Sequence, residues 1–286
     1  MLSSWASSCD DFFTDTTAVV IKKDKKGIRI FRIQNENGQT SYFKEAPPYD
    51  TAPRLHLIFD DTEMPVIAHS IAKSFGLEQV VPNAVFQPNG IVLSVKGKQL
   101  QTKPGILQEG VNDLITPIDD FFLKNPGKQP TAAGIQTILN QGEWPRLYAD
   151  WKILWRIFMQ TDLNIANLAH HNGRLCVFDT GDLLSLPNIR MEMGIIQDSH
   201  NSDFNMPGNH WDRIEHRPDF RKADPEYKNL VLKIANESEE ATSARLGKSL
   251  DDFFKPPKGS VRDHVRFMKQ EARKVLELLE RDPFSY

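Results

Sequence analysis

The sequence predicts an α+β fold in which a small antiparallel sheet carrying one helix is followed by a larger, mostly helical part. Two observations predict this order. Short β-rich runs separated by turn residues fill the stretch from Thr17 to Lys44 and return between residues 84 and 111. Apolar residues recur at helical spacing in later segments, most clearly in residues 260–282. A cleft is expected where the two parts meet.

The first part is expected to begin with three short strands between Thr17 and Lys44. The turns Asp24–Gly27 and Asn35–Gly38 contain hairpin residues, so these strands should form an antiparallel meander. A helix is expected over residues 62–77, with Gly76 as its stop. Further strands are expected at 84–88, 90–97 and 105–111, which completes a strand-rich region over residues 1–111.

The second part, residues 112–286, is expected to be mostly helical. Apolar periodicity predicts helices over residues 131–141, 146–160 and 260–282. Residues 191–224 are rich in Asn, Asp, His and Pro and show little periodicity, so long loops are expected there.

Composition excludes several classes of protein. The 286 residues carry a formal net charge of −3, with a pI near 6.3, which argues against a dedicated nucleic-acid binder. The two cysteines, Cys9 and Cys176, are too few for a disulfide framework or a cysteine-based zinc site. The sequence shows no secretory signal and no apolar run long enough for a transmembrane segment, so a cytoplasmic protein is expected.

Residues 160–182 contain the side chains that indicate chemistry. Asp162 and Asn167 are separated by four residues, and a two-stranded ribbon is expected to follow, turning at His171–Gly173 and ending at Asp179. Such a ribbon would bring two carboxylates and an amide oxygen to one edge, where they could hold a hard cation between phosphates. The pattern indicates a phosphoryl-transfer site.

This pattern resembles the catalytic loop of the protein-kinase superfamily, in which Asp, four residues and Asn precede an Asp-x-Gly at the end of a short hairpin. The resemblance implies a bilobal protein-kinase-like fold, with residues 1–111 as the N-lobe and 112–286 as the C-lobe. It implies ATP as the phosphate donor, Asp162 as the group that orients the acceptor hydroxyl and takes its proton, and Asn167 and Asp179 as ligands of Mg²⁺ or Mn²⁺. Gln160-Thr161 stands where the family has His-Arg, and Thr180 stands where it has Phe. These departures indicate an atypical member.

The same resemblance assigns residues upstream. Lys44, on the third expected strand, corresponds to the lysine that contacts the α- and β-phosphates, and Glu63 to the glutamate that pairs with it, with Glu78 as the competing choice. Backbone groups around Gln108 and Glu109 would meet the adenine edge. The family's glycine-rich loop is missing, and a basic turn at residues 22–27 occupies its place.

Compact bacterial effector kinases that are translocated into host cells lack part of the usual kinase motif set, as this chain does. The chain resembles them. This resemblance implies export by a specialised secretion system and a protein substrate in the host cell. One Legionella member is activated by inositol hexakisphosphate, which makes an inositol polyphosphate a candidate activator. The final helix aligns four cations on one face as a candidate polyanion patch, or simply a solvated face with i,i+4 partners: Arg262, Arg266, Lys269 and Arg273.

Three functions follow from these patterns. The leading hypothesis is an ATP- and metal-dependent protein kinase that modifies Ser or Thr of a partner protein. The first alternative keeps the fold and changes the acceptor to a phosphoinositide or a small molecule, or transfers AMP instead of phosphate. The second alternative is a pseudokinase that binds without catalysis, which the missing glycine loop favours and the joint retention of Lys44, Asp162, Asn167 and Asp179 opposes.

Overall fold

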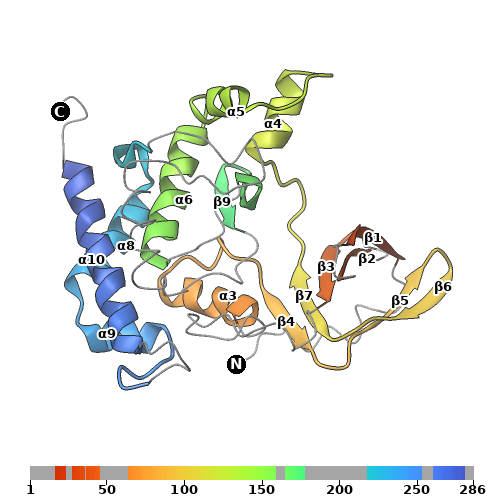
Figure 1. The fold of residues 1–286 in the computed structure, drawn as a ribbon, viewed down its shortest axis with the longest axis horizontal. Coiled ribbons are helices and arrows are strands. Elements are labelled where there is room, and N and C mark those ends of the chain that lie inside the picture. Colours follow the sequence, from red (N-terminus) through yellow and green to blue (C-terminus); the bar gives the residue numbers. More distant parts are fainter. Residues whose placement is uncertain are drawn as a thin grey trace.

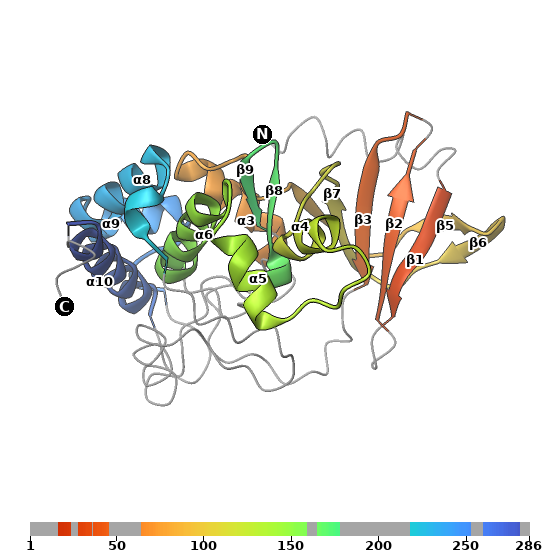
Figure 2. The ribbon, with the colours of Figure 1, turned by 90° about the horizontal axis from the view of Figure 1, so that it is seen from above.

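The structure is a computed structural model that describes residues 17–23, 28–35, 37–45, 64–158, 165–177, 218–252 and 260–280. Within these ranges the fold is α+β, as the sequence predicts, with an N-terminal sheet followed by C-terminal helices (Figure 1). The sheet lies at one end of the molecule and the last helices of the chain lie at the other (Figure 2).

The first three strands form the expected meander. β1 (Thr17–Lys23), β2 (Arg29–Gln34) and β3 (Thr40–Glu45) pair antiparallel in chain order. The second turn, Asn35–Gly38, is closed by the Asn35 side chain, whose oxygen accepts a hydrogen bond from the Gln39 N–H at 2.9 Å. The first turn, Asp24–Gly27, lies outside the described residues.

Four more strands complete a seven-stranded sheet, in the order β4-β7-β3-β2-β1-β5-β6. They are β4 (Ala84–Gln87), β5 (Val92–Val95), β6 (Lys98–Gln101) and β7 (Gly105–Glu109). β7 lies between β3 and β4 and pairs antiparallel with both. β5 joins β1 in parallel, through Ala18 and Val95.

The strand predicted over residues 90–97 is present as β5, and a strand that was not expected, β6, follows it. The chain forms a hairpin there, with β5 and β6 on either side of a turn at Lys96-Gly97, where φ is +51° and +74°. Positive φ at both central residues is typical of the tight hairpin turn whose twist matches that of the strands. β6 was not expected because the run Lys98–Gln101 is polar and lacks β-branched residues.

One face of the sheet has a small core of its own. Side chains that alternate along the strands pack there, and their members are Ala18, Phe31, Ile33, Phe43, Ile91, Leu93 and Leu107. This core is separate from the larger one between the helices.

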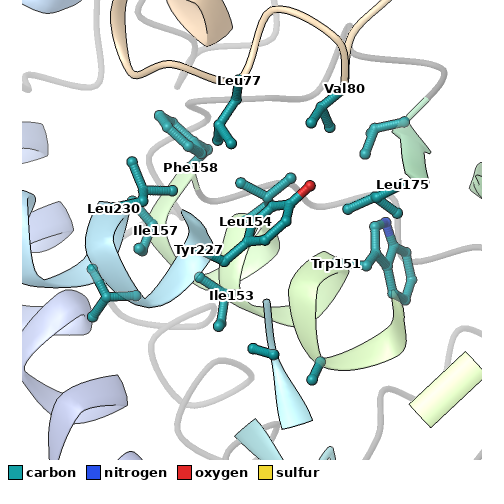
Figure 3. Close-up of a cluster of buried hydrophobic side chains, with 14 of the residues drawn as sticks. Leu77, Val80, Trp151, Ile153, Leu154, Ile157, Phe158, Leu175, Tyr227 and Leu230 are labelled. Atoms are coloured by element: carbon teal, nitrogen blue, oxygen red, sulfur yellow. The ribbon is translucent and has the colours of Figure 1, made fainter. Parts of the chain in front are cut away.

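The helix expected over residues 62–77 is α3 (Met64–Ser74), and it ends as predicted at Gly76, which has φ +83°. Its buried residues belong to the core of the C-terminal helices, whereas those of the sheet form the other cluster. Phe75, just past the helix, packs edge-on against Phe158 with ring centroids 5.3 Å apart. Figure 3 shows Leu77 and Val80, from the turn after α3, facing the same apolar cluster.

The predicted helices appear as α5 (Ala132–Leu139), α6 (Trp144–Phe158) and α10 (Val261–Glu280). α6 is buried along almost its whole length and contacts α10, α8 (Pro225–Asn236) and the short helix η3 (Phe220–Lys222). α6 is therefore the central element of the helical part.

Three short helices were not expected, although each has a local start signal. α4 (Pro117–Lys124) begins with a capping box between Thr116 and Asp119. α8 begins with a proline after Asp224. α9 (Glu239–Arg245) begins at Ser238, whose side chain accepts a hydrogen bond from the Ala241 N–H at 3.1 Å.

A search of the described helices finds none that is both long enough and apolar enough to cross a membrane.

Candidate functional site

Lys44 lies near the end of β3, between Ile30 of β2 and Ile106 of β7. Because side chains alternate along a strand, Lys44 faces away from the side on which Phe43 and Glu45 are buried. Its own side chain is exposed. This face of the sheet therefore presents an ammonium group beside two half-buried isoleucines, which suits a ligand with an apolar ring and a phosphate.

Gly105 allows β7 to approach β3 closely at this point. A Cβ on Gly105 would lie 2.6 Å from the Phe43 ring and would also meet the backbone carbonyl of Lys44. Any larger residue would push β7 away from β3, and with it Ile106 from Lys44.

Glu45 holds the end of β3 in place. Its side chain is 0 % exposed and accepts hydrogen bonds from the Arg29 guanidinium at 3.0 and 2.5 Å and from the backbone N–H groups of Arg29 and Lys103, each at 3.1 Å. Burial alone would raise the pKa of Glu45, but these hydrogen bonds outweigh it and hold the pKa below its usual value. The strand that carries Lys44 is thus fastened to β2 and to the segment before β7.

Gln108 and Glu109 lie at the end of β7, paired with Tyr42 and Ser41 of β3. The N–H of Glu109 already donates to the carbonyl of Asn83 at 2.8 Å, and the N–H of Gly110 donates to the carbonyl of Thr40 at 3.0 Å. The Glu109 N–H is therefore engaged within the protein, and the expected contact between an adenine edge and backbone groups around Gln108 and Glu109 stays a prediction. The first residues beyond these ladder bonds are those from Val111 onward.

The predicted ribbon is present as β8 (Leu168–His171) and β9 (Arg174–Val177). Its turn lies at Asn172-Gly173, where φ is +49° and +76°. Two further contacts hold it: the N–H of Val177 donates to the carbonyl of Val80 at 2.8 Å, and His170 forms an isolated antiparallel bridge with Ile115.

Asn167 is the last residue of the short helix η1 (Ile165–Asn167), directly before β8. Its side chain is half-buried, and none of the hydrogen bonds among the described residues uses its amide. The amide nitrogen is buried without a partner. A side-chain amide oxygen next to a rigid hairpin is a suitable metal ligand, because Mg²⁺ and Mn²⁺ prefer oxygen donors.

Asp162, Asp179 and Glu63 lie outside the described residues, so their expected positions stay predictions. The competing glutamate, Glu78, lies in the exposed turn after α3 and not on the helix. Among the described residues no group of three or more His, Cys, Asp or Glu side chains could hold a metal ion.

The sequence did not predict a partly buried ionic cluster behind the hairpin turn. Arg146 of α6 donates to the carbonyl of Gly173 at 2.5 Å, lies 3.5 Å from the Asp150 carboxylate and forms an ion pair with Asp224. Asp150 in turn accepts a hydrogen bond from the Asp224 N–H at 2.8 Å. The cluster fastens α6 to the hairpin and to the start of α8. Only the spacing of Arg146 and Asp150, four residues apart on one helix, could have indicated part of it.

Asp150 is buried, and burial raises its pKa to about 7 in spite of the Arg146 guanidinium. The neighbouring carboxylate of Asp224 acts in the same direction, because two negative charges so close repel each other. Asp150 is therefore a group whose protonation changes near neutral pH.

Lys269 does not belong to the candidate polyanion patch on α10, contrary to the prediction. This side chain is only 8 % exposed, and its ammonium group donates to the carbonyls of Ile234, at 2.8 Å, and of Glu237 at the end of α8. Arg262 and Arg266 form ion pairs with Glu239 of α9, a partner on another helix and not one of the i,i+4 partners that the sequence offered. Arg273 is exposed.

Comparison with known proteins gives similarity only at the level of structure. No protein-family model matches the sequence, and no curated protein matches it either. The fold is similar to that of a proinflammatory kinase of Helicobacter pylori, CtkA, with a TM-score of 0.40 and 11 % identity over 91 % of this chain and 90 % of that chain.

It is also similar to the Golgi casein kinase, with a TM-score of 0.40 and 11 % identity over 96 % of this chain and 74 % of the other. A structure of that kinase with Mn and ADP bound gives a TM-score of 0.41 at 11 % identity, over 96 % and 75 % of the two chains. These three structures are of kinases. At this degree of likeness, the function has to be argued from the residues of this chain.

Proposed function

We propose that this chain is an atypical metal-dependent protein kinase that transfers the γ-phosphate of ATP to Ser or Thr of a partner protein. The observation that carries the proposal is the register of the β8–β9 hairpin. Leu168 pairs with Val177, so Asn167 and the residues after Val177 leave the hairpin at the same end. Asp179 is two residues after Val177. Chain connectivity therefore keeps the Cα atoms of Val177 and Asp179 within about 7.6 Å of each other.

In this proposal the amide oxygen of Asn167 and the carboxylate of Asp179 hold Mg²⁺ or Mn²⁺, which would neutralise charge on the phosphates. Lys44 contacts the α- and β-phosphates, with Glu63 as its ion-pair partner. Asp162 orients the acceptor hydroxyl and takes its proton, the hydroxyl oxygen forms the new bond to the γ-phosphorus, and ADP leaves with the electron pair of the broken bond. Backbone groups around Gln108 and Glu109 meet the adenine edge.

The test is incubation of the purified protein with γ-labelled ATP and Mg²⁺ or Mn²⁺, together with acceptor proteins, phosphoinositides and small-molecule acceptors. We expect label on Ser or Thr of a protein, and its loss in Asp162→Ala and Asp179→Ala. Asp251→Ala, which removes an exposed carboxylate in the C-terminal region, is the matched control and should keep full activity.

The other outcomes separate the alternatives. Label only on lipid or small-molecule acceptors would show that the acceptor is not a protein, and the proposed metal site would stand. Added mass corresponding to AMP would replace phosphate transfer by AMP transfer. Nucleotide binding without transfer to any acceptor would overturn the proposal in favour of a pseudokinase. The proposal also includes an inositol polyphosphate as activator, which the addition of inositol hexakisphosphate to the assay tests. It further includes a substrate in a host cell and export by a specialised secretion system.

A further inference from the structure

A cavity of about 300 Å³ opens behind the hairpin, where the turn after α3, strand β9 and the start of α8 meet. Its floor is apolar and includes Leu77, Val80 and Leu175, all buried. Its volume lies at the lower end of the range of about 300–1,000 Å³ that is usual for small-molecule pockets. The cavity shares no residue with the Lys44 face of the sheet, so it is a separate place on the molecule.

Tyr227 supplies a buried hydroxyl group to this cavity. The residue is 1 % exposed, and Figure 3 shows its hydroxyl pointing toward Val80 and Leu175. Tyr227 lines the cavity, so its hydroxyl can donate one hydrogen bond to a group bound there. Burial also raises the pKa of Tyr227, so the group remains a donor. A ligand with an acceptor oxygen would satisfy it.

Two opposite charges line the same cavity without pairing. Arg174 of β9 and Glu226 of α8 are both exposed, and within the described part of the chain neither forms an ion pair with the other or with a third residue. The third charged side chain of the lining, Asp224, is engaged by Arg146. The described lining of the cavity thus offers one cation and one anion that are not paired with each other.

We propose that this cavity binds a small zwitterion of amino-acid size. The carboxylate of the ligand pairs with Arg174 and accepts the hydrogen bond of Tyr227, and its ammonium group pairs with Glu226. An apolar side chain covers Leu77, Val80 and Leu175. A polyanion fits less well, because the lining holds one free guanidinium against one free carboxylate. The proposal concerns a second site and does not depend on the proposed kinase activity.

Binding at this place would have a structural consequence. The hydrogen bond from Val177 to Val80 already joins β9 to the turn after α3. A ligand held between Arg174 and the start of α8 would add α8 to this junction, and the thermal stability of the chain should rise with ligand concentration.

The experiment is a titration of the full chain with each of the common amino acids, followed by amide chemical shifts in NMR spectra. We expect saturable shifts at β9 and the start of α8 with an apolar amino acid. The same amino acid with its amine acetylated, or with its carboxylate converted to an amide, should bind at least tenfold more weakly, because each blocked form loses one charge-assisted contact.

Matched variants locate the site. Arg174→Gln and Glu226→Gln should each weaken binding at least tenfold, and Glu240→Gln, an exposed charge on α9, should leave it unchanged. Tyr227→Phe should weaken binding, because it removes the donor to the ligand carboxylate, and its melting temperature checks that the fold is kept. Saturable binding that these variants leave intact, equal binding of the blocked forms, or no saturable shift with any amino acid would each overturn the proposal.

Discussion

Glu45 and Arg29 show how neighbours of a functional residue can decide its position. The Glu45 carboxylate is fully buried, and all four of its hydrogen bonds come from Arg29 and Lys103. Glu45 and Arg29 do not lie on the Lys44 face of the sheet. However, β3 cannot shift along β2 without breaking the hydrogen bonds between them. The position of the Lys44 ammonium therefore depends on a pair that the sequence does not mark.

We predict that Arg29→Ala lowers the free energy of unfolding by about 3 kcal/mol, because it leaves the buried Glu45 carboxylate without its ion pair. Urea unfolding measures the change. Arg32→Ala is the matched control, since Arg32 is the exposed arginine on the same strand and should cost no more than about 0.5 kcal/mol. Equal losses in the two variants would contradict the role given to Arg29.

The raised pKa of Asp150 predicts the direction in which the free energy of unfolding changes with pH. Its pKa is about 7 in the folded protein, above the ordinary 3.8, so the folded state binds more protons between these values. The contribution of Asp150 to stability is fully present below the ordinary pKa and is lost as the pH rises through about 7.

The free energy of unfolding of the native sequence should therefore fall from pH 4 to pH 7, relative to that of Asp150→Asn, in urea unfolding at a series of pH values. The asparagine keeps an oxygen for the Asp224 N–H. Asp251→Asn, at an exposed position, should follow the native curve. Parallel curves for the native sequence and Asp150→Asn would exclude the raised pKa.

At the scale of elements, close strand contact places the candidate site. β7 can lie against β3 only because residue 105 has no side chain, and the hairpin β8–β9 is held by Val80, Ile115 and Arg146. The local turn chemistry of the hairpin, Asn172-Gly173, could be predicted from the sequence. The contacts that fix its orientation come from three other parts of the chain.

Gly105→Ala should lower the free energy of unfolding by about 1–3 kcal/mol through overpacking between β7 and β3, and should weaken nucleotide binding. Gly97→Ala is the comparison, because a Cβ there meets nothing within 4 Å and only the positive φ is strained. Unfolding and nucleotide titrations on both variants test the pair. Unchanged nucleotide affinity in Gly105→Ala would remove the link between this strand contact and Lys44.

At the scale of the whole molecule, the two hydrophobic cores divide the chain differently from the boundary at residue 111 that the sequence indicated. α3 precedes that boundary, yet its buried residues belong to the core of α6, α8 and α10. Arg245 of α9 reinforces this arrangement, because its guanidinium donates to the carbonyl of Ser74 at 2.6 Å and lies 5.6 Å from the centre of the Phe75 ring. The sheet retains a far smaller core of its own.

This division predicts the order of local opening. Amide protons of α3 should exchange with nearly the same free energy as those of α6, and those of β2 and β3 should exchange at a lower value, because the sheet core is smaller. Hydrogen exchange followed by mass spectrometry measures this. Exchange of α3 together with the sheet would contradict the assignment of α3 to the helical core.

Local patterns in the sequence were sufficient for much of the fold. The meander from Thr17 to Lys44, the stop at Gly76, the hairpin turn at Asn172-Gly173 and the long amphipathic helix α10 were all predicted and are confirmed. Each depends on neighbouring residues only, through alternation, helical period or the φ that glycine permits. Strand β6 and the helices α4, α8 and α9 were not predicted. β6 is a polar run of four residues, which gives no strand signal.

What the sequence by itself determined is therefore the order of the elements and the residue types at the candidate catalytic positions, including Lys44 and Asn167. The tertiary structure decided which core α3 joins, that Lys269 closes the end of α8 and is not on the surface, and that Arg146, Asp150 and Asp224 form one buried cluster. The physical reason is distance along the chain. A charge finds a partner seventy or more residues away only after packing has brought the two elements together, and no local period encodes that meeting.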